Sequence, residues 1–430
     1  MEEEKKRPKV FYGWWIVLGA ALCGFVTTGG IQTIAVAAPY LETEFGWSRT
    51  LIVGAVGVGA LVVGFTGLAA GYLVDKIGPR LTVIIGALVG AAGLMLASLT
   101  NGPWLWYVSL GFLGATGVAF GGTIAPISTL RRWFMKRAAL TVSIALVGSG
   151  LGVVVLVPLY STLMESLGWR TTYLISGLVV IVGGLIGGIL LRKDPESSGM
   201  HPDGAEPEPQ EVEQRLDFMT RGEMWTVAEA LRNRNFWFLV LAQTCGMLVF
   251  AGFYPHVILW GLDLGLTPAG AASIMAFFAM ATIVGRVFGG AVSDWYMARF
   301  PRMTRKPIAY VNVTGVLVGS ILCATVVDSY SSMLAVLLVA GFAFSIGISI
   351  YPTYLGDLFG VANLPRLFAV KMLAIVLMGA ASPVFVGYVY DTTGTYTPAF
   401  WAGAAACAVS LVMLALIRHP RKRVALQVAS

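Results

Sequence analysis

Long apolar segments alternate with short polar segments along almost the whole chain. An α-helix needs about 20 consecutive apolar residues to cross the roughly 30 Å hydrocarbon core of a bilayer, and most of these segments reach that length. The pattern predicts twelve membrane-spanning helices, at about 11–39, 50–74, 80–100, 103–130, 138–166, 171–191, 236–261, 267–293, 307–327, 331–356, 365–389 and 397–417. We therefore expect an all-α membrane protein.

The longest polar stretch, 193–235, divides the predicted spans into two groups of six. We expect an N-terminal half at 11–192, a C-terminal half at 236–417 and polar tails at 1–10 and 418–430. The stretch contains HPDGAEPEPQEVEQ, which is too polar to fold alone, and WTVAEALRNRN, which can form a short amphipathic helix on a membrane surface. The composition supports this class, because 57% of the 430 residues are hydrophobic and 12% are charged.

Basic residues predict the orientation. All but four of the 29 Lys and Arg residues lie in the tails and in the loops after even-numbered spans; the exceptions are Arg49, Arg170, Arg286 and Lys371. The positive-inside rule places the tails and these loops in the cytoplasm.

The charged N-terminus leads directly into a full-length span, so we expect no cleaved signal peptide. We expect a monomeric multi-pass protein of the cytoplasmic membrane, whose net charge of +7 reflects topology and not nucleic-acid binding.

The sequence lacks common motifs of ATP hydrolysis and metal catalysis. It contains neither G-x-x-x-x-G-K-[ST] nor H-E-x-x-H. Cys23, Cys245, Cys323 and Cys407 fall within predicted spans without paired spacing, and we interpret them as small buried side chains. We therefore expect no enzymatic activity, no cofactor and no metal site.

Three side chains that can be positively charged lie well inside the predicted spans: His256, Arg286 and Lys371. No Asp or Glu accompanies them. A charged side chain at bilayer depth costs at least about 2.5 kcal/mol, so it normally faces a polar cavity or a pathway. Buried cations without a buried carboxylate need an anion from elsewhere, and the simplest source is an anionic substrate.

Several stretches resemble a known transporter family. G-Y-L-V-D-K-I-G-P-R at 71–80 resembles the signature between spans 2 and 3 of the major facilitator superfamily, and G-A-V-S-D at 290–294 weakly repeats its start after span 8. Further stretches resemble bacterial monocarboxylate transporters and oxalate/formate antiporters: Y-G-W-W at 12–15, E-F-G-W-S-R at 44–49, R-W-F-M-K-R at 132–137, G-S-G-L-G at 148–152 and Y-D-T-T-G-T-Y at 390–396. The resemblance implies two six-helix halves that rock around a midplane site.

The resemblance implies a substrate-binding arginine in span 8, and Arg286 occupies that position. A planar guanidinium can hold a carboxylate through two parallel hydrogen bonds, which lysine cannot do. Arg286 is eight residues from Asp294, about 12 Å along a helix, and so lies near the midplane. The alternative is a structural arginine that bonds to helix carbonyls or extends to the interface.

Lys371 lies about 8 Å inside span 11, five residues after Arg366. The resemblance to oxalate/formate antiporters implies a second cation in this span, a lysine, which together with the arginine suits a dianion. Alternatively, Lys371 extends to the cytoplasmic interface, and Arg286 alone binds a monocarboxylate. We favour the second outcome because Lys371 lies so near its helix end.

His256 lies in the outer part of span 7, where Pro255 can break the helix. A neutral imidazole can bond to a substrate oxygen, and its unperturbed pKa of about 6.5 allows proton exchange at physiological pH. The alternative is a histidine that packs between helices.

Other candidates follow from the family's substrate cavity, which is lined by spans 1, 4, 7 and 10. They are Gln32, Thr33, Thr123, Phe342, Phe344 and Tyr351, with Gln32 as the first choice and ordinary helix packing as the alternative for each. The family also implies a cytoplasmic gate, where charged pairs hold the two halves together. Here Asp75, Arg80 and Asp294 are the residues expected in that gate.

The chain departs from animal monocarboxylate transporters at two positions. Those relatives carry an acid one turn before the span 8 arginine, where this chain has Thr282, and a lysine in span 1, where it has Gln32 and Thr33. The acid of their proton relay is therefore missing here.

Glycines at 148–152 and at Gly285, Gly289 and Gly290 permit close helix packing.

These observations predict a secondary transporter that carries small organic anions by alternating access. The preferred substrates are monocarboxylates such as lactate or pyruvate, with either proton coupling or anion exchange. The alternatives are exchange of oxalate-like dicarboxylates and efflux of other anions. A cation or drug exporter typically holds a buried acid, and a membrane receptor would more plausibly add a folded cytoplasmic domain; the sequence has neither feature.

Overall fold

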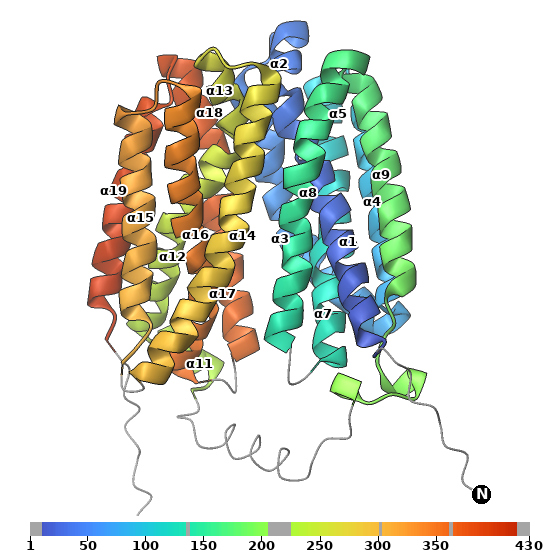
Figure 1. Ribbon diagram of the computed structural model, residues 1–430, viewed down its shortest axis with the longest axis vertical. Coiled ribbons are helices and arrows are strands. Elements are labelled where there is room, and N and C mark those ends of the chain that lie inside the picture. The colour runs from blue at the N-terminus through green and yellow to red at the C-terminus, as the bar shows by residue number, and fades with distance from the viewer. Residues whose placement is uncertain (1–10, 135–137, 205–224, 301–302, 361–363, 419–430) are drawn as a thin grey trace, which may run out of the picture.

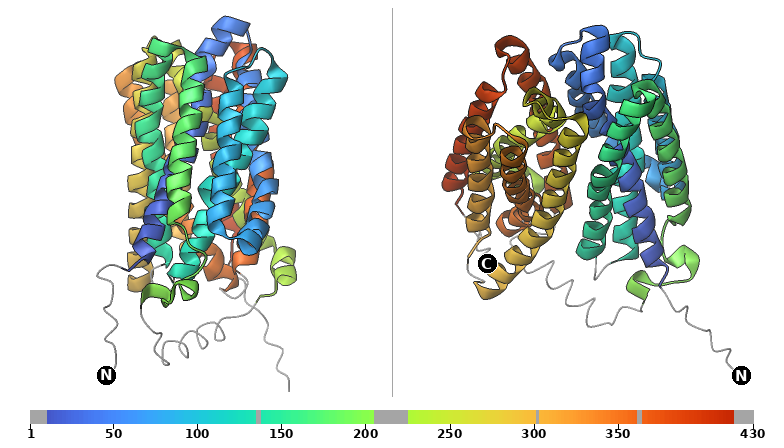
Figure 2. Two further views of the ribbon diagram at one scale, coloured as in Figure 1. Left: turned by 90° about the vertical axis from the view of Figure 1, so that its right-hand side faces the viewer. Right: turned by 45° about the horizontal axis from the view of Figure 1, so that its top comes forward.

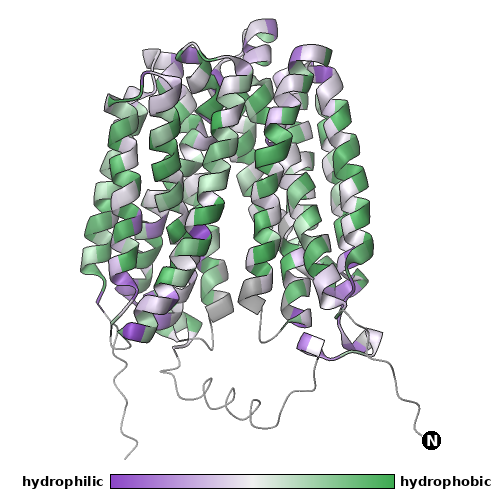
Figure 3. Ribbon diagram, viewed as in Figure 1, coloured by the Kyte–Doolittle hydropathy of each residue, from purple (hydrophilic) through white to green (hydrophobic). Residues whose placement is uncertain are grey.

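The computed structural model describes residues 11–134, 138–204, 225–300, 303–360 and 364–418. Within these residues all regular secondary structure is helical, and twelve segments are long and apolar enough to cross a membrane. The predicted all-α membrane class with twelve spans is confirmed. Apolar residues cover the middle of the bundle, and hydrophilic positions concentrate toward its two ends (Figure 3).

The first six spans form the N-terminal half. Their helices are α1 (Gly13–Ile31), α2 (Thr33–Phe45), α3 (Arg49–Ile77), α4 (Pro79–Ala97), α5 (Pro103–Trp106), α6 (Ala115–Gly117), α7 (Ile124–Trp133), α8 (Ala138–Leu167) and α9 (Trp169–Leu190). The fourth span runs from α5 to α7 and includes two π-helical stretches, η1 (Tyr107–Gly114) and η2 (Val118–Thr123). The first span continues to Phe45, beyond the predicted end at residue 39, and is divided between α1 and α2.

The last six spans form the C-terminal half. Their helices are α12 (Arg234–Phe253), η5 (Tyr254–His256), α13 (Val257–Asp263), α14 (Pro268–Arg299), α15 (Lys306–Thr325), α16 (Tyr330–Phe359), α17 (Leu364–Gly379), α18 (Ser382–Thr393) and α19 (Thr397–Leu416). Before them, the predicted amphipathic segment of the linker forms α11 (Val227–Arg232), which Thr226 and Glu229 begin with a capping box. The rest of the linker's polar run, 205–224, lies outside the described residues.

Local sequence explains where many helices begin and end. Ser48 caps α3 by accepting a hydrogen bond from the Leu51 amide, and Thr267 caps α14 in the same way at Gly270. Gly78 has a φ of 85° and lies directly before Pro79, so α3 stops and α4 starts within one residue. This turn belongs to the 71–80 signature.

We call the end of the bundle that holds Gly13 and Leu416 the terminal end, and the end that holds Phe45 and Asp263 the distal end. The two halves meet at the distal end, and their ribbons diverge toward the terminal end (Figures 1 and 2). One buried apolar cluster contains residues of both halves, whereas the two other clusters each belong to a single half. Among the described residues, the shared core is therefore confined to the cluster that reaches the distal end.

Small residues allow the close helix contacts that the sequence predicts. A Cβ atom at Gly148 or Gly152 on α8 would overlap the backbone carbonyl of Ala21 or Phe25 on α1. A Cβ at Gly285 on α14 would overlap the carbonyl of Phe342 on α16 in the same way. Gly290, by contrast, faces open space, since a Cβ there would have nothing within 4 Å, and it is not a packing glycine.

Candidate functional site

Arg286 lies near the middle of α14, about 20 Å along the helix from its end at Arg299. The side chain is half-buried, and its buried Nε atom has no hydrogen-bond partner among the described residues. Its backbone is held firmly, because Ser349 Oγ on α16 donates to the Arg286 carbonyl oxygen at 2.9 Å and Gly285 packs against α16. A guanidinium on a fixed backbone, without a partner, is a suitable group to receive an anion.

Lys371 lies on α17 and is completely buried. Its Nζ atom has no hydrogen-bond partner in the described part of the chain and lies 4.8 Å from the centre of the Phe368 ring. The favoured expectation that Lys371 extends to the interface does not match this placement, since an interfacial ammonium would be exposed. The cation–π contact compensates only part of the lost hydration.

Salt bridges do not neutralise these two cations. Among the described residues, salt bridges involve Arg49, Arg132, Arg170 and Arg305, all near helix ends, and none involves Arg286 or Lys371. The described C-terminal half thus holds two intramembrane cations without a protein carboxylate.

His256 lies in η5, where Pro255 interrupts span 7 as predicted. The imidazole is completely buried: Nε2 is 3.0 Å from the Pro383 carbonyl oxygen, and Nδ1 is 3.2 Å from the Tyr396 hydroxyl. The carbonyl can only accept, so the hydrogen-bond network assigns the proton to Nε2. Burial raises the pKa of Tyr396, so this hydroxyl keeps its proton and can donate it to Nδ1. Both ring nitrogens are therefore engaged within the C-terminal half.

Gln32 lies at the corresponding interruption of the N-terminal half, between α1 and α2. Its side chain is half-buried and makes no hydrogen bond to the described residues. Thr33 is buried, and its hydroxyl donates to the Gly30 carbonyl oxygen at 2.7 Å. Of the two, only Gln32 thus has a side chain without a hydrogen bond to the described residues.

The remaining cavity candidates are mainly aromatic. Phe344 stacks on Phe250 with ring centres 3.7 Å apart, and Phe342 packs against Phe288, two residues after Arg286, at 5.4 Å. Tyr351 is buried. Thr123 ends η2, and its side chain lies outside the described residues.

The residues predicted for the cytoplasmic gate pair within their own halves. Asp75 accepts from Arg132 at 2.6 Å, and Arg80 donates to the Ile189 carbonyl oxygen at 2.5 Å. Asp294 lies 3.7 Å from Arg305, which also binds Asp357. The contacts of Asp75, Arg80 and Asp294 therefore stay within their own halves in this conformation.

A family model described as the Major Facilitator Superfamily matches residues 20–309. The chain belongs to this superfamily. Membership agrees with the two six-helix halves and shows that the protein is a membrane transporter.

Curated relatives within the superfamily cover almost the whole chain. Monocarboxylate transporter 13 of Bos taurus is 26% identical over 414 residues, which cover 94% of this chain and 89% of the relative. Monocarboxylate transporter 12 of Xenopus laevis is 25% identical over 442 residues, covering 97% of this chain and 92% of the relative. A solved bacterial homologue of the human lysosomal transporter Spinster, in an inward-facing and occupied conformation, aligns with a TM-score of 0.69 at 17% identity, covering 95% and 93% of the two chains.

Sequence reasoning missed one cluster in this superfamily member. Arg49 contributed to the predicted orientation only as one more charge, yet it is buried at the distal end and binds Glu42, Asp263 and Tyr396. A signal did exist in the scarcity of basic residues on that side, which makes each one a candidate partner for nearby acids.

Proposed function

We propose that this superfamily member is a secondary carrier of small organic anions, with monocarboxylates as its main substrate class. The observation that carries the proposal is the guanidinium of Arg286 in the middle of α14, unpartnered among the described residues. The names of the curated relatives support the same class. In this proposal Arg286 binds the carboxylate, Gln32 faces it from the other half, and the aromatic side chains of Phe342 and Phe344 border the site.

The arrangement of the two halves supports alternating access in this proposal. The described structure joins the halves at the distal end and leaves their terminal-end charges paired within each half. If the termini are cytoplasmic, as the basic residues predict, this is the conformation that opens toward the cytoplasm. The cytoplasmic gate of Asp75, Arg80 and Asp294 would close in the opposite conformation.

A second candidate is exchange of dicarboxylates, and complete burial of Lys371 favours it. A lysine that has lost its hydration without gaining a partner is stabilised by any second carboxylate that reaches it.

Coupling of transport to an ion gradient follows one of two routes. Anion exchange needs no titrating protein group, whereas proton symport needs a proton on His256 or on the substrate.

Replacing Arg286 by lysine tests the proposal. The charge remains but the two parallel hydrogen bonds are lost, so we expect binding of monocarboxylates to weaken by about ten- to a hundredfold, as for loss of one charge-assisted hydrogen bond. Ligand-induced thermal stabilisation of purified protein measures this. The matched control is Arg170→Lys, because Arg170 pairs with Glu44 in its own half and its side chain is 41% exposed. Unchanged binding in Arg286→Lys would refute the assignment.

A further inference from the structure

Arg49 connects the two halves at the distal end. This first residue of α3 is only 6% exposed although its side chain is charged. Its Nε donates to Glu42 of its own half at 2.7 Å. The other two nitrogens reach the C-terminal half: Nη1 and Nη2 bind the two oxygens of Asp263 at 2.5 and 2.7 Å, and Nη1 also donates to the Tyr396 hydroxyl at 2.8 Å. The Arg49–Asp263 pair is therefore bidentate.

The guanidinium is also covered from one face. It lies 3.7 Å from the centre of the Tyr390 ring on α18, which belongs to the C-terminal half. One side chain of the N-terminal half is thus surrounded by Asp263 of α13, Tyr390 of α18 and Tyr396, which directly precedes α19. A cation with this many desolvated partners is costly to leave unpaired, so separating the halves there requires water or new partners to replace them.

The adjacent carboxylate completes a helix cap across the interface. Asp391 on α18 accepts from the backbone amides of Arg49 and Thr50 at 3.1 and 3.0 Å. These are the first two amides of α3, which have no partner inside their own helix. A negative charge at a helix N-terminus is also stabilised by the helix dipole. Here the capping carboxylate comes from the opposite half of the protein, 342 residues away along the chain from Arg49.

Two glycines let the backbone of α3 lie close to α18 and to the turn that precedes it. A Cβ atom at Gly387 would lie 2.8 Å from Thr50 Cα, and one at Gly57 would lie 2.5 Å from the Ala380 carbonyl oxygen. Both obstacles are backbone atoms, which a side chain cannot push aside without moving a helix. The contact of α3 with α18 therefore depends on the absence of a side chain at these positions.

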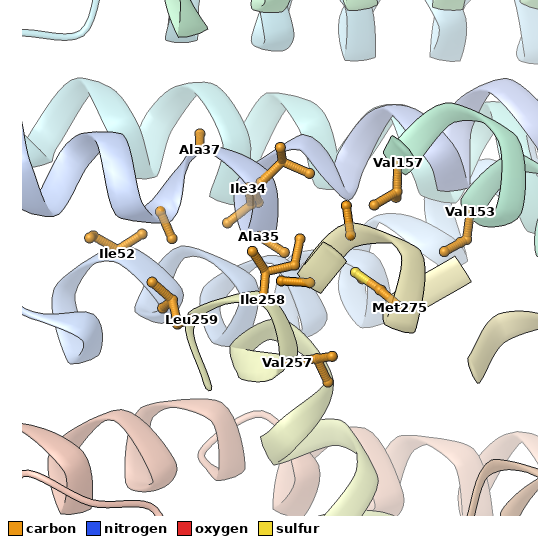
Figure 4. Packing of buried hydrophobic residues seen from close by; sticks show 14 of the residues in the cluster. Ile34, Ala35, Ala37, Ile52, Val153, Val157, Val257, Ile258, Leu259 and Met275 are labelled. Atoms are coloured by element: carbon orange, nitrogen blue, oxygen red, sulfur yellow. The ribbon is translucent and has the colours of Figure 1, made fainter. Parts of the chain in front are cut away.

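Apolar side chains continue this contact toward the middle of the bundle. Figure 4 shows Ile34 and Ala35 of α2 beside Ile258 of α13, and Val153 of α8 near Met275 of α14. All five are buried residues of the cluster shared between the halves. The polar contacts at Arg49 are thus accompanied by a buried apolar cluster that both halves share.

We propose that Arg49 and Asp391, with Asp263 and Tyr396 as partners, form a latch that holds the distal end closed and must break when this end opens. Opening would leave Arg49 with Glu42, which moves with the same half, and would remove the cap from α3. This latch goes beyond the substrate proposal, because it requires only that the two halves move relative to each other. It also explains why the closed end keeps the buried guanidinium of Arg49.

Distances between spin labels test the latch without any substrate. Labels at Ser166→Cys and Thr325→Cys, both exposed at the distal end of different halves, report its opening in protein whose native cysteines are replaced by alanine. Gly387→Ala places a Cβ against the α3 backbone, so we expect most molecules to shift to a longer label distance. Gly379→Ala is the matched control in the same span, because nothing lies within 4 Å of its Cβ position.

Asp391→Asn tests the cap more gently, because it removes only the charge of the capping group. Loss of a charged cap should lower the ratio of closed to open molecules by about tenfold. Asp328→Asn is its control, since Asp328 lies at the same end but bonds to Ser332 of its own half. If Gly387→Ala and Asp391→Asn give the same distance distributions as their controls, the latch is wrong. That result would leave carboxylate binding at Arg286 unaffected, so the two proposals fail separately.

Discussion

A cation in the middle of a membrane helix is informative because so few residue types can be placed there at low cost. Arg286 and Lys371 stand out in the sequence for this reason alone. The environment of Lys371 was not predictable in the same way. Its distance from Arg366 indicated an interfacial ammonium, but the side chain is completely buried. A position along a helix does not specify the direction in which a flexible side chain points.

Replacing Lys371 by methionine distinguishes the two substrate classes. Methionine keeps much of the length and removes the charge, so dicarboxylates should bind about ten- to a hundredfold more weakly and monocarboxylates much less so. Competition binding with both classes measures the difference. Lys193→Met, at an exposed position of the terminal end, controls for the loss of one positive charge. Equal weakening of both classes would mean that Lys371 contributes only to the general positive charge of the site.

At the scale of helices, the most informative feature is that spans 1 and 7 are interrupted at corresponding places. Interrupted helices in equivalent positions of two repeats often mark the binding site of a transporter. Pro255 made the second interruption predictable. The interruption in span 1 contains no proline, and its sequence signal is weak, because only Gly29 and Gly30 precede Gln32. The Thr33 hydroxyl donates a hydrogen bond to the Gly30 carbonyl oxygen. Sequence patterns therefore showed one interruption and missed its partner.

His256 can be tested with a substitution that preserves its two hydrogen bonds. Glutamine can accept from Tyr396 and donate to the Pro383 carbonyl oxygen, but it cannot take up a proton near neutral pH. If His256 couples transport to protons, His256→Gln should remove the pH dependence of uptake between about pH 5.5 and 7.5 and leave exchange active. Uptake in vesicles at several pH values measures this. Should the profile of His256→Gln equal that of the original protein, His256 has a structural role, and His256→Leu should then disturb the distal end instead.

At the scale of the whole molecule, the twelve spans were predictable because hydrophobic length reports on the bilayer, and the two halves because one long polar stretch separates them. The latch was not predictable. It joins Arg49, Asp263 and Asp391, which are far apart in the sequence, and it exists only while the distal end is closed. Contacts that form in one conformation leave no periodic pattern in the chain. The same reasoning explains why Asp75 and Asp294 are found in pairs within their halves, although the family implies a bridge between the halves.

The unpartnered cations of the described C-terminal half have an electrical consequence. Moving one elementary charge through a membrane potential of 100 mV involves about 2.3 kcal/mol, so a carrier that reorients with uncompensated charge responds to voltage. With Arg286 and Lys371 both charged, a dicarboxylate would cancel their charge during reorientation, and a monocarboxylate would leave one positive charge in the field. We therefore expect the rate of dicarboxylate exchange to be indifferent to an imposed potential and the rate of monocarboxylate exchange to depend on it. Flux measurements in vesicles with a potassium diffusion potential test this, and the opposite pattern would indicate that Arg286 alone is charged.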